Sequence, residues 1–182
     1  MLKSTLLDST ANKIMSFLTL HSEMSFYDKE ISEQTGISRG MTNRLLNQFL
    51  KIGLVSRERR GRMWFYSLNR TPLFKYYRIY ENLIELTELM NTLKPFVQKV
   101  ILFGSAASGE DTAESDIDLL VIAEQKDKAL KEIRAFKTER EVKPIVQTVS
   151  EYAVSRKKDK VFYEEIARGI TLFEKEIDEQ RL

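Results

Sequence analysis

Two neighbouring segments hold the residues best suited to chemistry. The first is an apolar run, residues 100–103, that ends at Gly104 and Ser105 and is followed by Gly109. The run is typical of a buried strand that breaks into a loop, where backbone N–H groups are exposed and no bulky Cβ atom blocks a phosphate. The segment therefore predicts an anion-binding loop.

The second segment supplies two carboxylates. Asp116 and Asp118 are two residues apart at the start of the apolar run 117–122. If that run is a strand, both carboxylates point to one face of it. Beside a phosphate loop they suit a hard divalent cation such as Mg²⁺, which completes its coordination with water and phosphate oxygens. The alternative is a glycine turn followed by solvated acids at a strand end.

The combined pattern resembles the Gly-Ser…Ser-Asp-x-Asp-Leu signature of the polymerase-β-type nucleotidyltransferase superfamily, most closely its minimal nucleotidyltransferases, over roughly residues 95–175. The resemblance implies that the nucleotide triphosphate is bound by Gly104, Ser105, Gly109 and Ser115. It also implies that Asp116 and Asp118 are the catalytic residues and hold Mg²⁺ or Mn²⁺. The substrate would be an NTP.

The sequence departs from that family pattern at two places. Many minimal members carry Arg just before the second glycine of the loop, where this chain has Ser108. The family's third carboxylate belongs on a later strand, but the stretch 142–149 contains no Asp or Glu. Glu141 and Glu151 flank it, and Gln147 could supply an amide oxygen. That third group usually helps to draw the proton from the attacking hydroxyl, so its loss affects chemistry more than binding.

Composition indicates a compact, soluble protein. The chain has 182 residues, is 42% hydrophobic, and shows neither a basic-apolar leader nor an apolar run of about 18 residues. We therefore expect a cytoplasmic protein that does not enter a membrane. With no cysteine there is neither a disulfide nor a thiolate metal site, and the single His21 excludes a histidine cluster.

Charge is distributed unevenly along the chain. Residues 1–80 hold 13 Lys and Arg against 6 Asp and Glu, a net charge of +7, so the remainder carries −5. This asymmetry favours two domains, the first of which faces a polyanion.

The first 70 residues have the order of a helix-turn-helix followed by a hairpin. Ser9 or Thr10 begins an apolar-periodic helix. A short helix over 27–34 ends at a Gly36 turn, and Ser38 caps a longer helix. The run 54–68 then predicts two strands joined by a basic turn that contains glycine.

Residues 8–70 resemble a winged helix-turn-helix domain of the MarR or ArsR kind, which implies binding to double-stranded DNA. By that resemblance the residues at the major groove are Arg39, Thr42, Asn43 and Arg44. Those of the wing, at the backbone or minor groove, are Arg57, Arg59, Arg60 and Arg62. A solvated face, or a surface that contacts another protein, is the alternative for these arginines.

A long helix is predicted between the domains. Apolar residues recur at helical spacing over 71–94, and further apolar residues extend the apolar surface to a second side of the helix. Such a helix needs two partners, and we expect one of them to be a second subunit in a homodimer, with packing within the chain as the alternative. The predicted domains are thus 1–70, a linker helix over 71–94, and 95–182.

The last domain alternates strands and helices. After the carboxylates we expect a helix over 126–137, a strand over 142–149, helix over 152–167 and a final apolar segment, 169–173. The fold class is therefore α/β of the mixed, α+β kind. Basic residues 156–160 are expected to form a solvated surface.

Two functions of different classes follow. In the first, a DNA-binding protein transfers a nucleoside monophosphate from Mg-NTP to an unknown acceptor hydroxyl. In the second, a winged-helix transcriptional regulator carries a degenerate nucleotidyltransferase-like domain that only senses nucleotide. The position of the third carboxylate discriminates between them.

Overall fold

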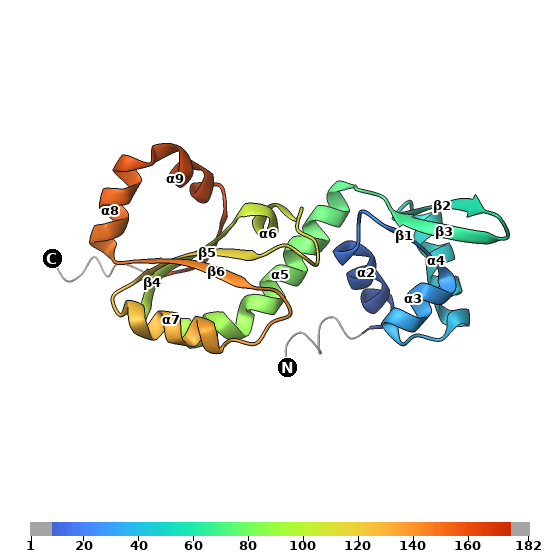
Figure 1. Ribbon diagram of the computed structural model, residues 1–182, viewed down its shortest axis with the longest axis horizontal. Coiled ribbons are helices and arrows are strands. Elements are labelled where there is room, and N and C mark those ends of the chain that lie inside the picture. Colours follow the sequence, from blue (N-terminus) through green and yellow to red (C-terminus); the bar gives the residue numbers. More distant parts are fainter. Residues whose placement is uncertain (1–8, 176–182) are drawn as a thin grey trace. The chain divides into compact units, whose positions relative to one another are not determined.

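The computed structural model describes residues 9–175, which form two compact units (Figure 1). The first unit runs to Glu81 and includes Asp111–Ala113, and the second holds the rest. The division falls inside helix α5 (Pro72–Leu93), whereas the sequence predicted a separate linker over 71–94. The reason is that the start of α5 packs into the core of the first unit through Phe74, while its end packs into the other core. None of the helices in the described part of the chain is long and apolar enough to cross a membrane.

The first unit combines three helices with a three-stranded antiparallel sheet. Its elements before α5 are α2 (Thr10–Leu20), β1 (Ser25–Tyr27), α3 (Asp28–Thr35), α4 (Arg39–Lys51), β2 (Val55–Arg60) and β3 (Met63–Leu68). The strand order is β1-β3-β2. Strand β1 was expected only as a connector, because three residues are too few to show an alternating pattern.

Local signals determine where these helices begin and end. Ser9 caps α2, since its Oγ accepts a hydrogen bond from the backbone N–H of Asn12 at 3.2 Å. Gly36 ends α3 with a φ of 68°, a left-handed conformation that glycine adopts without strain. Residues 36–38 then lead into α4. Ile31 of α3 and Leu46 of α4 are fully buried in the same core, which holds the two helices together.

The second unit is a four-stranded mixed sheet covered by helices. Its elements after α5 are β4 (Val97–Phe103), α6 (Gly104–Ser108), β5 (Ile117–Ala123), α7 (Lys126–Ala135), β6 (Val142–Gln147), α8 (Val149–Lys158), α9 (Lys160–Ala167) and β7 (Ile170–Glu174). The strand order is β6-β5-β4-β7. Strands β5 and β6 are parallel and joined through α7, and the other pairs are antiparallel. The mixed α/β class is confirmed.

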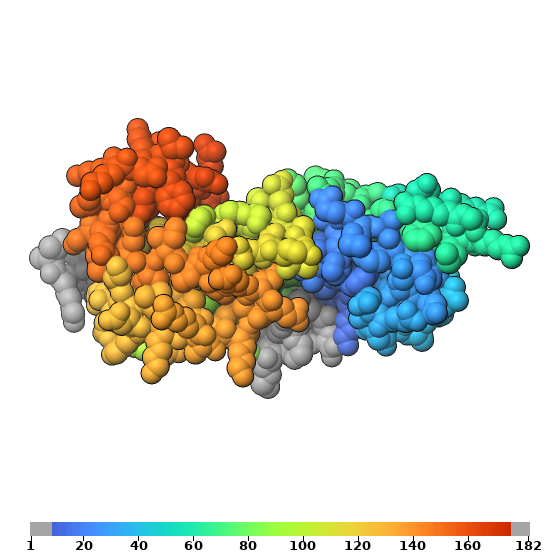
Figure 2. Space-filling model, viewed as in Figure 1, coloured from blue at the N-terminus to red at the C-terminus, as the bar shows by residue number. Residues whose placement is uncertain are grey.

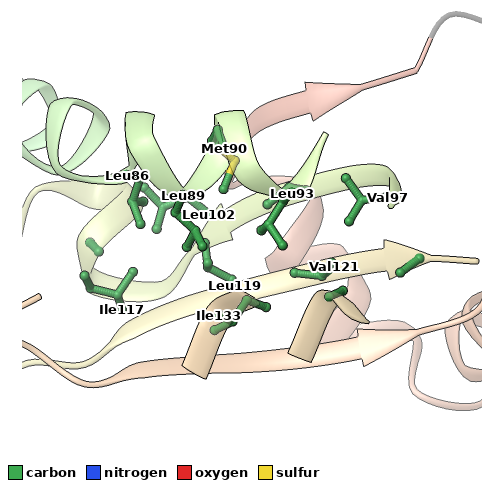
Figure 3. Packing of buried hydrophobic residues seen from close by; sticks show 14 residues of the cluster. Leu86, Leu89, Met90, Leu93, Val97, Leu102, Ile117, Leu119, Val121 and Ile133 are labelled. Atoms are coloured by element: carbon green, nitrogen blue, oxygen red, sulfur yellow. The ribbon is translucent and has the colours of Figure 1, made fainter. Parts of the chain in front are cut away.

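Both faces of the central strand β5 are covered, which explains its unbroken apolar run. On one face Leu119 and Val121 pack against α5 and α7, as Figure 3 shows. On the other face Leu120 packs against Tyr163 and Ile166 of α9. In Figure 1, α7 accordingly lies on one side of the sheet, and α8 and α9 on the other.

The stretch predicted as helix over 152–167 is in fact two helices. The chain breaks at Asp159, whose side chain caps α9 by accepting from the backbone N–H of Phe162 at 3.2 Å. Helix α8 begins at Val149 with a capping box formed by Thr148 and Glu151. The strand before it is shorter than predicted and ends at Gln147.

A buried ion network lies in the first unit. Arg78 donates to Asp111 at 2.7 Å and to Glu81 at 3.1 Å, and all three side chains are almost fully buried. Thr19 Oγ1 also donates to Glu81 Oε2, the oxygen that accepts from Arg78, at 3.0 Å. A buried charge is tolerated only when it is paired, so the partners of this network depend on one another.

Replacing Arg78→Met should destabilise the protein by about 3–5 kcal/mol, because it leaves the carboxylates of Asp111 and Glu81 without their cation. Denaturant unfolding measures this loss. The matched control is Lys29→Met, which breaks an exposed ion pair with Glu33 and should cost less than about 1 kcal/mol. Equal losses in the two variants would contradict the role given to burial.

Candidate functional site

The predicted glycine-serine bend and one predicted carboxylate meet in the second unit. Strand β4 ends at Phe103, which is the antiparallel partner of Asp118 on β5. Gly104 follows with a φ of 69°, and a Cβ atom placed there would lie only 2.7 Å from Oδ2 of Asp118. A side chain at position 104 would be strained and would also displace the carboxylate. The bend and the carboxylate of Asp118 therefore lie side by side, while the roles assigned to them stay predictions.

Hydrogen bonds that involve Asn82 and Glu85 of helix α5 hold the backbone just after the bend. Ala106, in the short helix α6, is fully buried, and its carbonyl accepts a hydrogen bond from Asn82 Nδ2 at 2.9 Å. Asn82 Oδ1 in turn accepts from Arg140 at 2.8 Å, and Arg140 also pairs with Glu85 at 2.7 Å. These groups are buried or nearly so. The backbone of α6 is thus fixed by a polar chain of contacts within one unit.

The other two residues predicted for the triphosphate have different surroundings. Gly109 ends α6 with a φ of 69°, and its N–H donates to the carbonyl of Ser105. It therefore shapes the loop. Ser115 is partly buried in the segment just before β5.

A hollow of about 370 Å³ opens beside the bend. Gly104 and Ser105 line it, and so does Arg168, which the sequence interpretation missed. Arg168 follows α9, and the next residue, Gly169, lies so close to β4 that a Cβ atom there would be 2.3 Å from the carbonyl oxygen of Leu102. This close packing places Arg168 at the hollow. Its walls also include Ala107, Ser108, Glu110 and Glu165.

Burial and neighbouring charges shift the pKa of Asp118, one of the two predicted carboxylates. Burial raises the pKa of Asp118 above its ordinary value, and the nearby charge of Asp116 raises it further, while Lys143 acts in the opposite direction. Asp116 and Asp118 are both partly buried. Asp118 is the second residue of β5, and Asp116 directly precedes the strand.

Lys143 is a second site residue that sequence reasoning did not find. It stands opposite Asp118 in the parallel register of β5 and β6. Its Nζ lies 2.5 Å from Oδ2 of Asp116, and the hydrogen bond to Asp116 raises the pKa of Lys143. The sequence did hold a signal for it. Lys143 is the first exposed residue of β6, the strand that was expected to carry the third carboxylate.

The candidates for that third carboxylate lie elsewhere. Gln147 accepts from Tyr163 Oη at 2.9 Å and donates to Ser155, so it belongs to the contacts with α8 and α9. Glu151 caps α8 and pairs with Lys126 at 2.8 Å. Glu141 is exposed. Within residues 9–175 no three acidic or histidine side chains gather as a metal-binding group.

Most of the residues predicted to bind DNA are exposed on the first unit. At the start of α4, Arg39 donates to Asp28 at 2.8 and 3.0 Å, and Asn43 donates to the same carboxylate at 3.2 Å. These contacts lower the pKa of Asp28, the hydrogen bond from Arg39 being the largest cause. Arg44 is exposed as well. Asp28 therefore orients two of the predicted base-contacting side chains.

Thr42 is the exception. It is fully buried, so its side chain cannot reach a DNA base, and its predicted role is corrected. On α4 it lies on the face that carries the buried Leu46 and Phe49. The sequence interpretation assigned it to the groove by resemblance, from its place near the start of the second helix, although its helical spacing put it with the core.

The four arginines of the hairpin are exposed, and the hairpin projects from the first unit (Figure 2). Arg57 lies over the ring of Trp64 at 4.4 Å, and Arg60 over the ring of Phe65 at 4.9 Å. Arg59 donates to the carbonyl of Gly61 at 3.2 Å. Arg62 is in the turn itself. Aromatic rings thus hold two of the guanidinium groups on the strand surface.

Comparison with known protein families supports the geometry of the second unit. The family model "Polymerase beta, Nucleotidyltransferase" matches residues 82–178, more than half of the chain. The chain belongs to this nucleotidyltransferase family. The match begins at Asn82, where the second compact unit also begins. No curated protein and no solved structure matches the chain.

Polymerase β nucleotidyltransferases generally use a nucleoside triphosphate and a divalent metal ion, and nucleotidyl transfer is the general activity of the family. The matched region contains the bend, the carboxylate pair, Lys143 and Arg168. All the site geometry described for the second unit therefore falls inside the nucleotidyltransferase domain.

Replacing Gly104→Ala should weaken triphosphate binding at least tenfold in calorimetric titration, because the new Cβ atom displaces the carboxylate of Asp118. The matched control is Gly36→Ala, where φ is also positive but no atom lies within 4 Å of the added Cβ. Both variants should lose about 1–2 kcal/mol of stability from the left-handed backbone. Only the first should change binding, and equal binding by the two would contradict this account of the site.

Proposed function

We propose that the second unit binds a nucleoside triphosphate with Mg²⁺ and transfers its nucleoside monophosphate to an acceptor hydroxyl. The observation that carries this proposal is the contact between the Gly104 bend and the Asp118 carboxylate. It puts a phosphate-accessible backbone and a metal-binding group on adjacent strand ends. Transfer joins the acceptor oxygen to the α-phosphorus and releases pyrophosphate.

The donor set fits one divalent cation of the kind that this family uses. Asp116 and Asp118 would hold the ion, and Mg²⁺ is bound in proteins by one or two carboxylates together with substrate phosphates. Mn²⁺ has the same preference for oxygen ligands. When bound, the ion supplies a Lewis acid that neutralises the charge of the phosphoryl oxygens. Because Gly104 has no side chain, the backbone of the bend can lie directly against the carboxylate of Asp118.

Arg168 supplies positive charge on the other side of the bend. The family's loop arginine is replaced here by Ser108, and Arg168 lines the same hollow as Ser108 and Ser105. Arginine recognises phosphate oxygens with two parallel N–H groups. We therefore assign to Arg168 the phosphate contact that the loop itself does not provide.

Labelled ATP, CTP, GTP and UTP, offered with Mg²⁺ or Mn²⁺ and with protein, RNA and small-molecule acceptors, test the proposal. Label should be transferred by the wild type, and Asp118→Asn should reduce the transfer at least a hundredfold. The matched control is Asp127→Asn, an exposed acid on α7, which should keep full transfer. Absence of both binding and transfer with all four nucleotides would contradict the proposal.

A second candidate function is favoured by one observation. Lys143, not an acid, faces the carboxylate pair. A site of this composition can bind nucleotide while transferring it slowly, which suits a sensor domain in a regulator. Tight binding of a triphosphate with no transfer to any acceptor would support this candidate over the enzyme.

For the first unit we propose a winged helix-turn-helix that binds double-stranded DNA. The order α3, turn, α4 and hairpin supports it. So does the exposure of its cations, namely Arg39, Arg44, Arg57, Arg59, Arg60 and Arg62. The start of α4 would enter the major groove, and the hairpin would lie along the backbone or minor groove.

We further propose that the chain acts on DNA as a homodimer. Leu73, Tyr76 and Tyr80 form a stripe on the first half of α5 and are 59%, 71% and 42% exposed. Exposed apolar side chains at this spacing suit contact with the same helix of a second copy.

Removing the charges of Arg59 and Arg60 as a double glutamine variant should weaken DNA binding at least tenfold at low salt and reduce its salt dependence. Gel shifts measure both, and sedimentation of the same complexes should find two chains on each DNA. The matched control is Lys131→Gln with Arg134→Gln on α7, two exposed cations of the second unit. Unchanged DNA retention in the wing variant would count against the proposed surface. A complex with only one chain on each DNA would count against the dimer.

A further inference from the structure

Lys143 lies beside the carboxylate pair on the neighbouring strand. It stands opposite Asp118 in the parallel register, and its Nζ lies 2.5 Å from Oδ2 of Asp116. Residues paired in register on adjacent strands point to the same face of a sheet. One ammonium group and two carboxylates therefore lie together at the start of β5.

Stability alone does not account for a lysine at this place. Its side chain is 54% exposed and that of Asp116 is 34% exposed. Ion pairs with this much exposure contribute about 0–1 kcal/mol to folding. The larger effect is on the local charge, because the two carboxylates repel each other. Lys143 places a positive charge beside both of them.

The same charge limits how many metal ions the site can hold. Two divalent ions about 3.5–4 Å apart need several carboxylates to hold them. Within the described residues no third acid joins the pair. An ammonium group beside Asp116 would also repel a second divalent ion. It can nevertheless contact phosphate oxygens as a point charge.

We propose that Lys143 is a built-in second cation, so that this site binds its nucleotide with one divalent ion, where a carboxylate at position 143 would admit two. This inference rests on the proposed nucleotide site. An ammonium group offers no open coordination position, so it neutralises charge without binding the acceptor hydroxyl as a metal ion does. The class of ligand that the lysine favours is a nucleoside triphosphate that carries a single Mg²⁺ or Mn²⁺.

Counting bound Mn²⁺ tests the inference without relying on activity. The probe is Mn²⁺ with the α,β-methylene analogue of whichever triphosphate binds best, and electron paramagnetic resonance or native mass spectrometry gives the number of ions in each nucleotide-bound chain. Wild type should bind one ion. Lys143→Glu and Lys143→Asp, which add a carboxylate, should each bind two.

Two control variants separate the lysine from its surroundings. Lys143→Met removes the charge without adding a ligand and should keep one ion. Glu141→Gln removes the exposed acid that directly precedes β6, the nearest to Lys143 in sequence, and should also keep one ion.

The outcomes are distinguishable. Two ions in the wild type, or one ion in both acidic variants, would overturn the role of Lys143 and leave the proposed nucleotide site standing. A wild type that binds none of the four triphosphates would overturn the proposed function and this inference with it. If the wild type binds two ions and Glu141→Gln binds only one, the carboxylate that holds the second ion is that of Glu141, and the role proposed for Lys143 is overturned.

Discussion

The close approach between Asp118 and the backbone at Gly104 is the constraint on which the second unit depends. Strand β4 must end where its antiparallel partner presents that carboxylate, and the chain must then turn through a left-handed residue with no room for a side chain. Both requirements fall on one glycine. The register of two strands thus determines whether a phosphate and a carboxylate can be neighbours, and the rest of the unit keeps that register.

The register is kept by burial on both faces of β5 and by polar support behind the loop. Leu119 and Leu120 point to opposite faces, and each is fully buried, so a slip of one residue would put Asp118 into a core. The chain from Arg140 through Asn82 to the carbonyl of Ala106 fixes α6 independently of the strands. The site is therefore held by two separate kinds of interaction, apolar packing and buried hydrogen bonds.

Sequence predicted well what depends on neighbours along the chain. Hydrophobic periodicity and capping residues gave most helices and strands to within a few residues, including α4 and β5, and the motif indicated the bend at Gly104 that lies against Asp118. It missed what depends on distant partners. Arg168 reaches the hollow only because Gly169 packs on β4, and Lys143 joins the carboxylates only through the pairing of β6 with β5. Thr42 was misplaced because its position near the start of α4 was given more weight than the helix face on which it lies.

The lysine also changes how the two candidate functions should be weighed. A nucleotidyltransferase must both hold the triphosphate and activate the acceptor hydroxyl, and these tasks make different demands on the same carboxylates. Asp118, against the bend, suits the first task. Asp116, paired with Lys143, is less free for the second. Because the ion pair is partly exposed, its energy is small and an incoming acceptor or ion can displace it. In the proposed site an acceptor or ion must compete with Lys143 for Asp116, and the outcome of that competition would separate a slow transferase from a nucleotide sensor.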